Sequence, residues 1–308
     1  MDLPKAQTFT RTRALGLAID FGVSTLGARL VALDSRRILA ESRELNQLNC
    51  YGQDAAGRLA YGRRQGGERL RQTALAQLAA LRQRLCLTAG VDPLQVGEAV
   101  VVGDSAGLHL LANYPPEDFP PAPGDAYPGL DIERQDILPG LTCYLPPGAA
   151  GACGPDLAAA LLALDFAHPT ENRLYLKIAS EGYLALNTGG QIHCCTLPLG
   201  PVFEGLSLSK GLLPGPGAIY QAELRGEELL LRTFDGGAPL GLSGSGLVSL
   251  LALLLKAEAL SNKGQLLKGH PLSANLENQP GGLVFRLPGT AVTLPRNDIL
   301  QAQLAKAA

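Results

Sequence analysis

Two stretches of this 308-residue chain, 15–45 and 173–200, carry the same order of patterns. Each contains two short apolar runs joined by a turn of small residues and followed by a third run, which predicts a three-stranded meander. The first stretch reads "LGLAIDFG", "GARLVALD" and "RRILAESREL", and the second reads "RLYLKIAS", "EGYLALNTGG" and "QIHCCTLPLG". A meander that occurs twice, each time with helices after it, predicts two related lobes and an α/β fold with internal duplication.

The segments around the meanders predict the helices of each lobe. Apolar residues in 66–87 recur at the spacing of an amphipathic helix, at positions Leu70, Ala74, Leu75, Leu78, Leu81 and Leu85. Further helices are expected around Leu108–Leu111, over 154–167 and over 246–260, with a buried strand over 97–104.

The division of the chain follows from these elements. A proline-rich surface loop is expected over 114–130, because proline disfavours both helices and sheet ladders. We expect a flexible tail over 1–13, a first lobe over 14–168 and a second lobe over 169–308.

Composition excludes several classes of function. Charged residues make up 18% of the chain and the formal net charge is −2, which argues against nucleic acid and anionic membrane surfaces as partners. The six cysteines form no C-x-x-C pair, so neither a zinc site nor an iron–sulfur cluster is expected. The uncharged run 238–255 is too short in its helical part to span a bilayer. We therefore expect a soluble, cytoplasmic protein without a bound metal cluster.

The turn between the first two predicted strands has the residue types of a phosphate-binding loop. It carries Asp20, Gly22, Ser24 and Thr25, whose small side chains let the backbone approach an anion and whose N–H and hydroxyl groups can donate to it. The aspartate would hold hydrated Mg²⁺ or orient water. The same residues are also compatible with an ordinary hairpin, and this motif alone does not decide between the two.

Longer segments resemble a known family in the same order along the chain. "DFGVSTLGARLVALD", "YGQDAAGRLAYG", "VVVGDSAGLHLL", "GACGPDLAAALLA", "GPVFEGLSLSKGLLPGPGAI", "GLSGSGLVSLLALLL" and "VTLPRNDILQAQLAKAA" resemble the reductive activators of corrinoid proteins. The resemblance implies an actin-like (ribonuclease H-like) bilobal ATPase fold, related to actin, sugar kinases and heat-shock chaperones. It further implies ATP and Mg²⁺ as ligands, and a corrinoid protein or corrinoid methyltransferase as partner.

The resemblance also implies which residues form the nucleotide site. Asp20 and Glu204 would serve in catalysis. The nucleotide-binding residues would be Gly22, Ser24, Thr25, Ser180, Gly182, Gly200, Pro201, Gly205, Gly241, Gly244, Ser245 and Gly246. A helix that begins near Gly244 would present bare N–H groups, which suits an anion. For Glu204 the alternative is a carboxylate favoured by the dipole of a helix start.

A second set of residues would face a partner according to the same resemblance: Asn46, Gly52, Asp54, Arg58 and His109. The alternative for the first four is a solvated loop before a helix, with the Asp54 carboxylate and the Arg58 guanidinium paired. For His109 it is a histidine at the start of a helix with a local hydrogen bond.

Three features depart from the family pattern. The second phosphate loop, roughly D-I-G-T-N-G-E in the family, reads "KIASEGY" over 177–183, so Lys177 replaces an aspartate and Glu181 would repel phosphate. The sequence ends at Ala308, where the family continues, so we expect an incomplete second lobe whose open edge would invite a partner or self-association. No cluster ligands for electron transfer are present, so we expect no iron–sulfur cluster in this chain.

These departures leave three interpretations. The first is a degenerate ATPase fold that binds a corrinoid protein or methyltransferase with weak or no ATP hydrolysis. The second is an active ATP-dependent component of corrinoid activation whose missing parts come from other chains. The third is an inert fragment that folds poorly. We favour the first interpretation.

Overall fold

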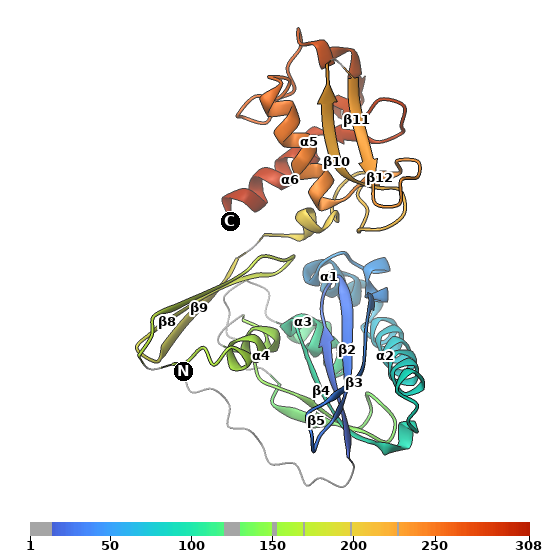
Figure 1. Ribbon diagram of the computed structural model, residues 1–308, viewed down its shortest axis with the longest axis vertical. Coiled ribbons are helices and arrows are strands. Elements are labelled where there is room, and N and C mark those ends of the chain that lie inside the picture. The colour runs from blue at the N-terminus through green and yellow to red at the C-terminus, as the bar shows by residue number, and fades with distance from the viewer. Residues whose placement is uncertain (1–13, 120–129, 150–152, 169, 198, 227) are drawn as a thin grey trace. The chain divides into compact units, whose positions relative to one another are not determined.

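The computed structural model describes residues 14–119, 130–149, 153–168, 170–197, 199–226 and 228–308 (Figure 1). Contacts divide the chain into two compact units. Unit 1 contains Met1–Lys177 and Tyr183–Thr196, and unit 2 contains Ile178–Gly182 and Leu197–Ala308.

A six-stranded sheet forms the centre of unit 1. Its spatial order is β3(Ile38–Leu45), β2(Thr25–Ala32), β1(Leu15–Phe21), β4(Val96–Gly103), β6(Thr142–Leu145) and β5(Ile132–Arg134). Strands β1, β2 and β3 are antiparallel neighbours, which confirms the first predicted meander, and β4 joins β1 in parallel. Buried and exposed residues alternate from Leu17 to Phe21 of β1, as expected for a strand with one face on the core.

One face of this sheet is covered by α1(Ala55–Gln65), α2(Glu68–Ala89) and α3(Ser105–Leu111), whose apolar residues contribute to its core. Helix α4(Pro155–Ala163) contacts β4, but its buried residues belong to a separate apolar cluster. Helix α2 packs on β2 and β3 (Figure 1). The leucines predicted from the helical spacing are buried, except Leu75, which is half-buried. Helix α1 was not predicted, because two glycines and several polar residues obscure its periodicity.

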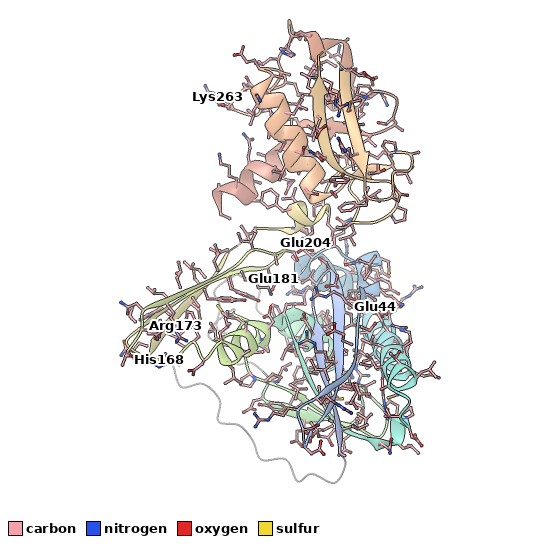
Figure 2. All side chains as sticks on the ribbon, in the orientation of Figure 1. Glu44, His168, Arg173, Glu181, Glu204 and Lys263 are labelled. Carbon is pink, nitrogen blue, oxygen red and sulfur yellow. The ribbon has the colours of Figure 1, made fainter. Side chains whose placement is uncertain are left out.

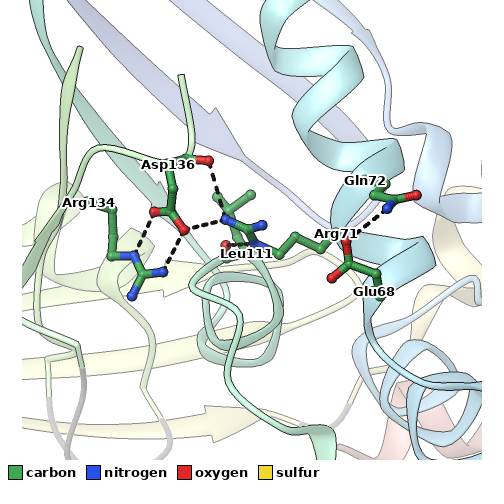
Figure 3. Close-up of polar contacts among 6 residues, drawn as sticks. All are labelled: Glu68, Arg71, Gln72, Leu111, Arg134 and Asp136. Carbon is green, nitrogen blue, oxygen red and sulfur yellow. Dashed lines mark hydrogen bonds and ion pairs between the residues drawn. The ribbon is translucent and has the colours of Figure 1, made fainter. Parts of the chain in front are cut away.

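An ion-pair network ties α2 to the far edge of the sheet (Figure 3). Arg71 of α2 donates from Nε to the Leu111 carbonyl at 3.1 Å and from Nη2 to Asp136 Oδ2 at 2.7 Å. Arg134 of β5 donates to both oxygens of the same carboxylate, at 2.8 and 2.7 Å. The hydrogen bond from Arg134 lowers the pKa of Asp136, and Arg71 acts in the same direction.

The second predicted meander is also present, as β7(Arg173–Lys177), β8(Gly182–Thr188) and β9(Gln191–Leu197) in a sheet of their own. Tyr183, Ala185 and Ile192 form a small core with α4 residues, including Leu157 and Leu161. This core explains why Tyr183–Thr196 belongs to unit 1 by contacts.

Unit 2 contains two three-stranded sheets and two helices. The strands are β10(Ala218–Arg225), β11(Glu228–Thr233), β12(Gly241–Leu242), β13(Leu276–Gln279), β14(Gly282–Arg286) and β15(Thr293–Pro295). Helices α5(Gly244–Lys256) and α6(Arg296–Ala307) share one core with both sheets. The β13–β15 sheet was not predicted. Within the described residues no helix has the length and apolarity of a membrane span.

Short 3-10 helices complete the fold: η1(Gln47–Cys50), η2(Pro93–Gln95), η3(Pro116–Asp118), η4(Pro201–Glu204) and η5(Pro271–Asn275). Most of the proline-rich loop expected over 114–130 lies outside the described residues, which resume at Leu130. Helix α5 is not buried on all sides, since Val248 and Leu255 are exposed.

Candidate functional site

The turn between β1 and β2 brings the first four predicted residues together in unit 1. Asp20 lies near the end of β1 and opposes Gly27 of β2, Gly22 and Ser24 lie in the turn, and Thr25 begins β2. A Cβ on Gly22 would lie 2.8 Å from the Thr25 carbonyl oxygen, so a larger residue would open the turn. Ser24 is buried.

The carboxylate of Asp20 sits in a partly charged environment. Its side chain is half-exposed, and Arg43 Nη2 lies 4.0 Å from its Oδ2. Partial burial raises the pKa of Asp20, and Asp156 adds to the rise, whereas Lys177 and Arg43 oppose it. Asp20 also lines an open cavity of about 730 Å³ between the exposed face of the sheet and Ala159 of α4. This volume is in the range of small-molecule sites.

Lys177 ends β7 and forms a short ion pair. Its Nζ donates to Asp156 Oδ2 at 2.5 Å, and the same ammonium lies 5.0 Å from the centre of the Tyr183 ring. Burial alone lowers the pKa of Lys177, but the charge and hydrogen bond of Asp156 outweigh it, so the pKa is raised. Lys177 is therefore a fixed cation at the position where the family pattern has a carboxylate.

Asp104 is a buried carboxylate that the sequence analysis did not single out. It caps α3, and its Oδ1 accepts from the Gly107 N–H at 2.7 Å. Burial raises its pKa, while the Gly107 hydrogen bond and the Arg58 charge lower it. The motif "GDSAG" carries the signal for such a cap, because an aspartate there precedes an apolar helix.

The second predicted phosphate loop meets Glu204 inside unit 2 (Figure 2). The Ser180 N–H donates to Glu204 Oε1 at 2.7 Å. Glu204 is the last residue of the four-residue η4 and still lies within its first turn, so its expected position at a helix start is confirmed. Its carboxylate accepts a hydrogen bond from a backbone N–H of the kind that a phosphate oxygen would use. Gly200 and Pro201 begin the same short helix, and Gly205 ends it.

The glycine-rich start of α5 is a packing feature of unit 2. A Cβ on Gly244 would lie 1.6 Å from the Phe203 carbonyl oxygen, and one on Gly246 would lie 2.0 Å from that of Ile219. Ser243, which was not predicted, caps the helix by accepting from the Gly246 N–H at 3.1 Å. Ser245, by contrast, is exposed. Gly182 begins β8, and Gly241 begins β12.

The residues that the resemblance assigned to a partner surface are largely internal. Asn46, Arg58 and His109 are each at most 3% exposed. Asp54 caps α1 through the Gly57 N–H at 2.7 Å, and Gly52 is half-buried beside it. The alternative of a solvated loop is therefore wrong for Asn46 and Arg58, which are buried, whereas Gly52 and Asp54 lie just before a helix as it expected.

His109 lies in the last turn of α3, not at its start. Its Nε2 is 2.8 Å from the Pro115 carbonyl oxygen, which confirms the expected local hydrogen bond. Burial lowers the pKa of this histidine.

Unit 1 thus gathers Asp20, the first turn and Lys177, while unit 2 gathers Ser180, Glu204 and the start of α5. Among the described residues no three His, Cys, Asp or Glu side chains form a group that could hold a metal ion. Lys177, which is paired with Asp156, is a cation and cannot serve as a second carboxylate ligand for Mg²⁺.

The first sheet contains a strand meander that is extended by a parallel strand, with a turn of small residues after its first strand. The second half of the chain contains a helix with a glycine-rich start. Together these features define an actin-like α/β protein of the ASKHA class. Residues 15–169 match the family model "RACo middle region", and residues 171–308 match "C-terminal domain of RACo the ASKHA domain". The chain belongs to the RACo family.

Known proteins similar to this chain carry names of the same kind. The "Corrinoid activation enzyme RamQ" of Eubacterium limosum is 25% identical over 95% of this chain and 53% of its own length. The "[Co(II) methylated amine-specific corrinoid protein] reductase" of Methanosarcina barkeri is 22% identical over 90% and 55%. A solved "Reductive activator for corrinoid,iron-sulfur protein" superposes with a TM-score of 0.71 at 26% identity, covering 99% of this chain and 51% of its own. The chain therefore spans about half the length of these relatives.

Proposed function

We propose that this chain is a degenerate ATPase-fold member of the family that binds a corrinoid protein or a corrinoid methyltransferase and hydrolyses ATP weakly or not at all. The relatives named above act on corrinoid proteins, and this supports the choice of partner. One observation carries the loss of ATP chemistry: the second predicted phosphate loop is occupied by side chains of the chain itself.

The occupation has two parts with opposite charge. The Glu204 carboxylate accepts the Ser180 N–H at 2.7 Å, so a phosphate at that donor must first displace an anion of its own sign. Lys177, bonded to Asp156 at 2.5 Å, adds a cation where Mg²⁺ would need a carboxylate. Both replacements weaken binding of Mg²⁺–ATP.

The first loop supports the alternative of an active component completed by other chains. Asp20 is accessible and the turn from Gly22 to Thr25 is preserved. In this alternative the chain would bind ATP through Asp20 and the start of α5, with Ser245 exposed there. Electron transfer would then come from a separate iron–sulfur protein.

Calorimetry with ATP and ADP in the presence of Mg²⁺ separates the two proposals. We expect no heat at millimolar nucleotide from the folded wild-type chain, and measurable binding by Glu204→Ala, which frees the Ser180 donor. Glu181→Ala is the charge-matched control: it removes an equal charge from the same loop but leaves the Ser180–Glu204 hydrogen bond in place, so its nucleotide binding should stay weaker than that of Glu204→Ala. Micromolar binding by the wild-type chain that is lost in Asp20→Ala would overturn the degenerate site and favour the active component.

The partner proposal is tested separately. The purified chain, mixed with a purified corrinoid protein and with its methyltransferase, should form a complex detectable by analytical ultracentrifugation without nucleotide. Binding to neither would refute this part. Self-association is a further proposal, supported by the exposed Val248, Leu255, Leu300 and Leu304 of unit 2, and the same sedimentation run on the chain alone tests it.

A further inference from the structure

Three successive carbonyl groups of the β1–β2 turn are bound from one side by one segment of unit 1. The Gly22 carbonyl accepts from Asn46 Nδ2 at 2.8 Å, and the Val23 carbonyl accepts from Arg58 Nη2 at 2.5 Å. The Ser24 carbonyl accepts from Asn49 Nδ2 at 3.1 Å and from the Asn46 N–H at 3.0 Å. No carbonyl in this run is left to rotate.

The direction of these carbonyls fixes the direction of the amides. In a trans peptide the C=O of one residue and the N–H of the next point to opposite sides of the chain. Because the carbonyls of Gly22, Val23 and Ser24 all point toward the clamping segment, the N–H groups of Val23, Ser24 and Thr25 point away from it. A run of amides with one common direction is the arrangement that binds an anion.

The clamping segment is itself braced. Arg58 also donates from Nε to the Gly52 carbonyl at 3.1 Å and from Nη2 to Asn49 Oδ1 at 2.9 Å. Asp54 caps the helix that carries Arg58. A Cβ on Gly52 would lie 2.5 Å from the Arg58 backbone nitrogen, so this glycine lets η1 and α1 approach closely.

Arg58 contributes charge as well as geometry. Its side chain is buried, the residue being 2% exposed, and a guanidinium remains protonated in proteins. A permanent cation behind the turn makes the potential on the amide side more positive. The several N–H donors of the planar guanidinium explain why arginine suits this site, because Nε donates to one carbonyl while Nη2 donates to a second carbonyl and to an amide oxygen.

We propose that Asn46, Asn49 and Arg58 are positioning residues of the first phosphate loop, which hold its amides ready for a phosphate group without a metal ion. This inference rests on the proposed function, in which the first loop is the part of the nucleotide site that keeps its form. The inference gives Asn46 and Arg58 a role in supporting the loop, whereas the family resemblance placed them at a partner surface.

Backbone NMR of the full chain, with inorganic pyrophosphate as the probe and no Mg²⁺, tests the inference. We expect saturable shifts at the amides of Val23, Ser24 and Thr25, and about tenfold weaker binding in Arg58→Met, since one charge-assisted contact is removed. Arg58→Lys should recover part of the affinity, because it restores the charge without the fork. Arg63→Met is the matched control: Arg63 lies on the same helix and donates to the carbonyls of Pro116 and Phe119, away from the turn.

The outcomes separate positioning from stability and from the proposed function. Asn49→Ala removes the contact with the Ser24 carbonyl and one acceptor of Arg58, and it covers the case in which Arg58→Met does not fold. It should weaken pyrophosphate binding while the chain stays folded, with a urea midpoint lowered by no more than the loss of these hydrogen bonds explains. Equal affinity in wild type, Arg58→Met and Asn49→Ala would overturn the inference, as would absence of shifts at these amides in the wild-type chain. Neither result touches the self-occupied second loop, whereas tight Mg²⁺–ATP binding by the wild type would sink the proposed function and leave the clamp standing.

Discussion

The pair between Lys177 and Asp156 makes a quantitative prediction. Lys177→Met keeps the aliphatic length of the side chain and its contact with the Tyr183 ring, but removes the charge. Asp156→Asn keeps the size of the acid and removes its charge. The two single variants and the double variant form a thermodynamic cycle that isolates the interaction between the two groups.

The magnitude follows from burial. The side chains are 32% and 12% exposed, and the two atoms are 2.5 Å apart. Exposed pairs contribute about 0.2–1 kcal/mol, and removal of one partner from a fully buried pair costs about 3–5 kcal/mol. A pair of intermediate burial should give a coupling energy of about 2 kcal/mol, with Lys177→Met the more damaging single change because it leaves Asp156 buried and charged.

Urea unfolding followed by circular dichroism measures the cycle, since the chain contains no tryptophan for fluorescence. The coupling should persist in 0.5 M NaCl, because buried pairs are screened less than exposed ones. A coupling energy below about 0.5 kcal/mol would mean that the pair behaves as an exposed one. The argument that an internal cation is fixed in the second loop would then fail.

Three further predictions concern stability. Gly244→Ala should lower the free energy of unfolding in urea by at least about 3 kcal/mol, because the added Cβ would meet a backbone oxygen. Ser245→Ala, at the exposed neighbour, should change this free energy by less than about 0.5 kcal/mol. Similar losses in the two variants would refute the packing role. Asp136→Asn should cost about 1 kcal/mol at pH 7 and progressively less as the pH falls below 3.8, because the Arg134 hydrogen bond lowers the pKa of Asp136, so its contribution is present above 3.8 and is lost as the pH falls. A loss that does not change with pH would contradict this. Asp104→Asn keeps the helix cap and should remove the decline in stability that the parent shows as the pH rises above 3.8, since burial raises the pKa of Asp104; an unchanged pH profile would refute it.

The regular elements could be predicted because their signals are local. The alternating apolar residues of β1 and β2 and the leucine spacing of α2 place these elements within about two residues of their bounds. Helix α1 escaped detection because Gly57 and Gly62 lower its intrinsic propensity, and tertiary contacts of Arg58 and Leu59 stabilise it instead. The β13–β14 hairpin carried a signal in its "PGG" turn that could have been used.

The candidate site could be predicted only in part, for a physical reason. Each phosphate-loop residue was visible as a small residue after an apolar run, but its partner lies far along the chain. Arg58 reaches a carbonyl 35 residues away, and Ser180 meets a carboxylate 24 residues away. Pairings over such distances follow from packing of whole elements and leave no local pattern, so the clamp and the self-occupied loop emerge only in three dimensions.

Some buried polar atoms without a hydrogen-bond partner in the described part of the chain belong to carboxylates that interact electrostatically with Lys177. Within the described residues, three buried side-chain atoms have no hydrogen-bond partner: Arg82 Nε, Asp104 Oδ2 and Asp156 Oδ1. Two of them belong to carboxylates that act electrostatically on one another and on Lys177. An acidic pocket of this kind requires a cation, because buried carboxylates are costly without one. Lys177 supplies that cation through its ion pair with Asp156, and this arrangement supports the proposal that an internal ion pair stands where the family pattern has a metal-binding carboxylate.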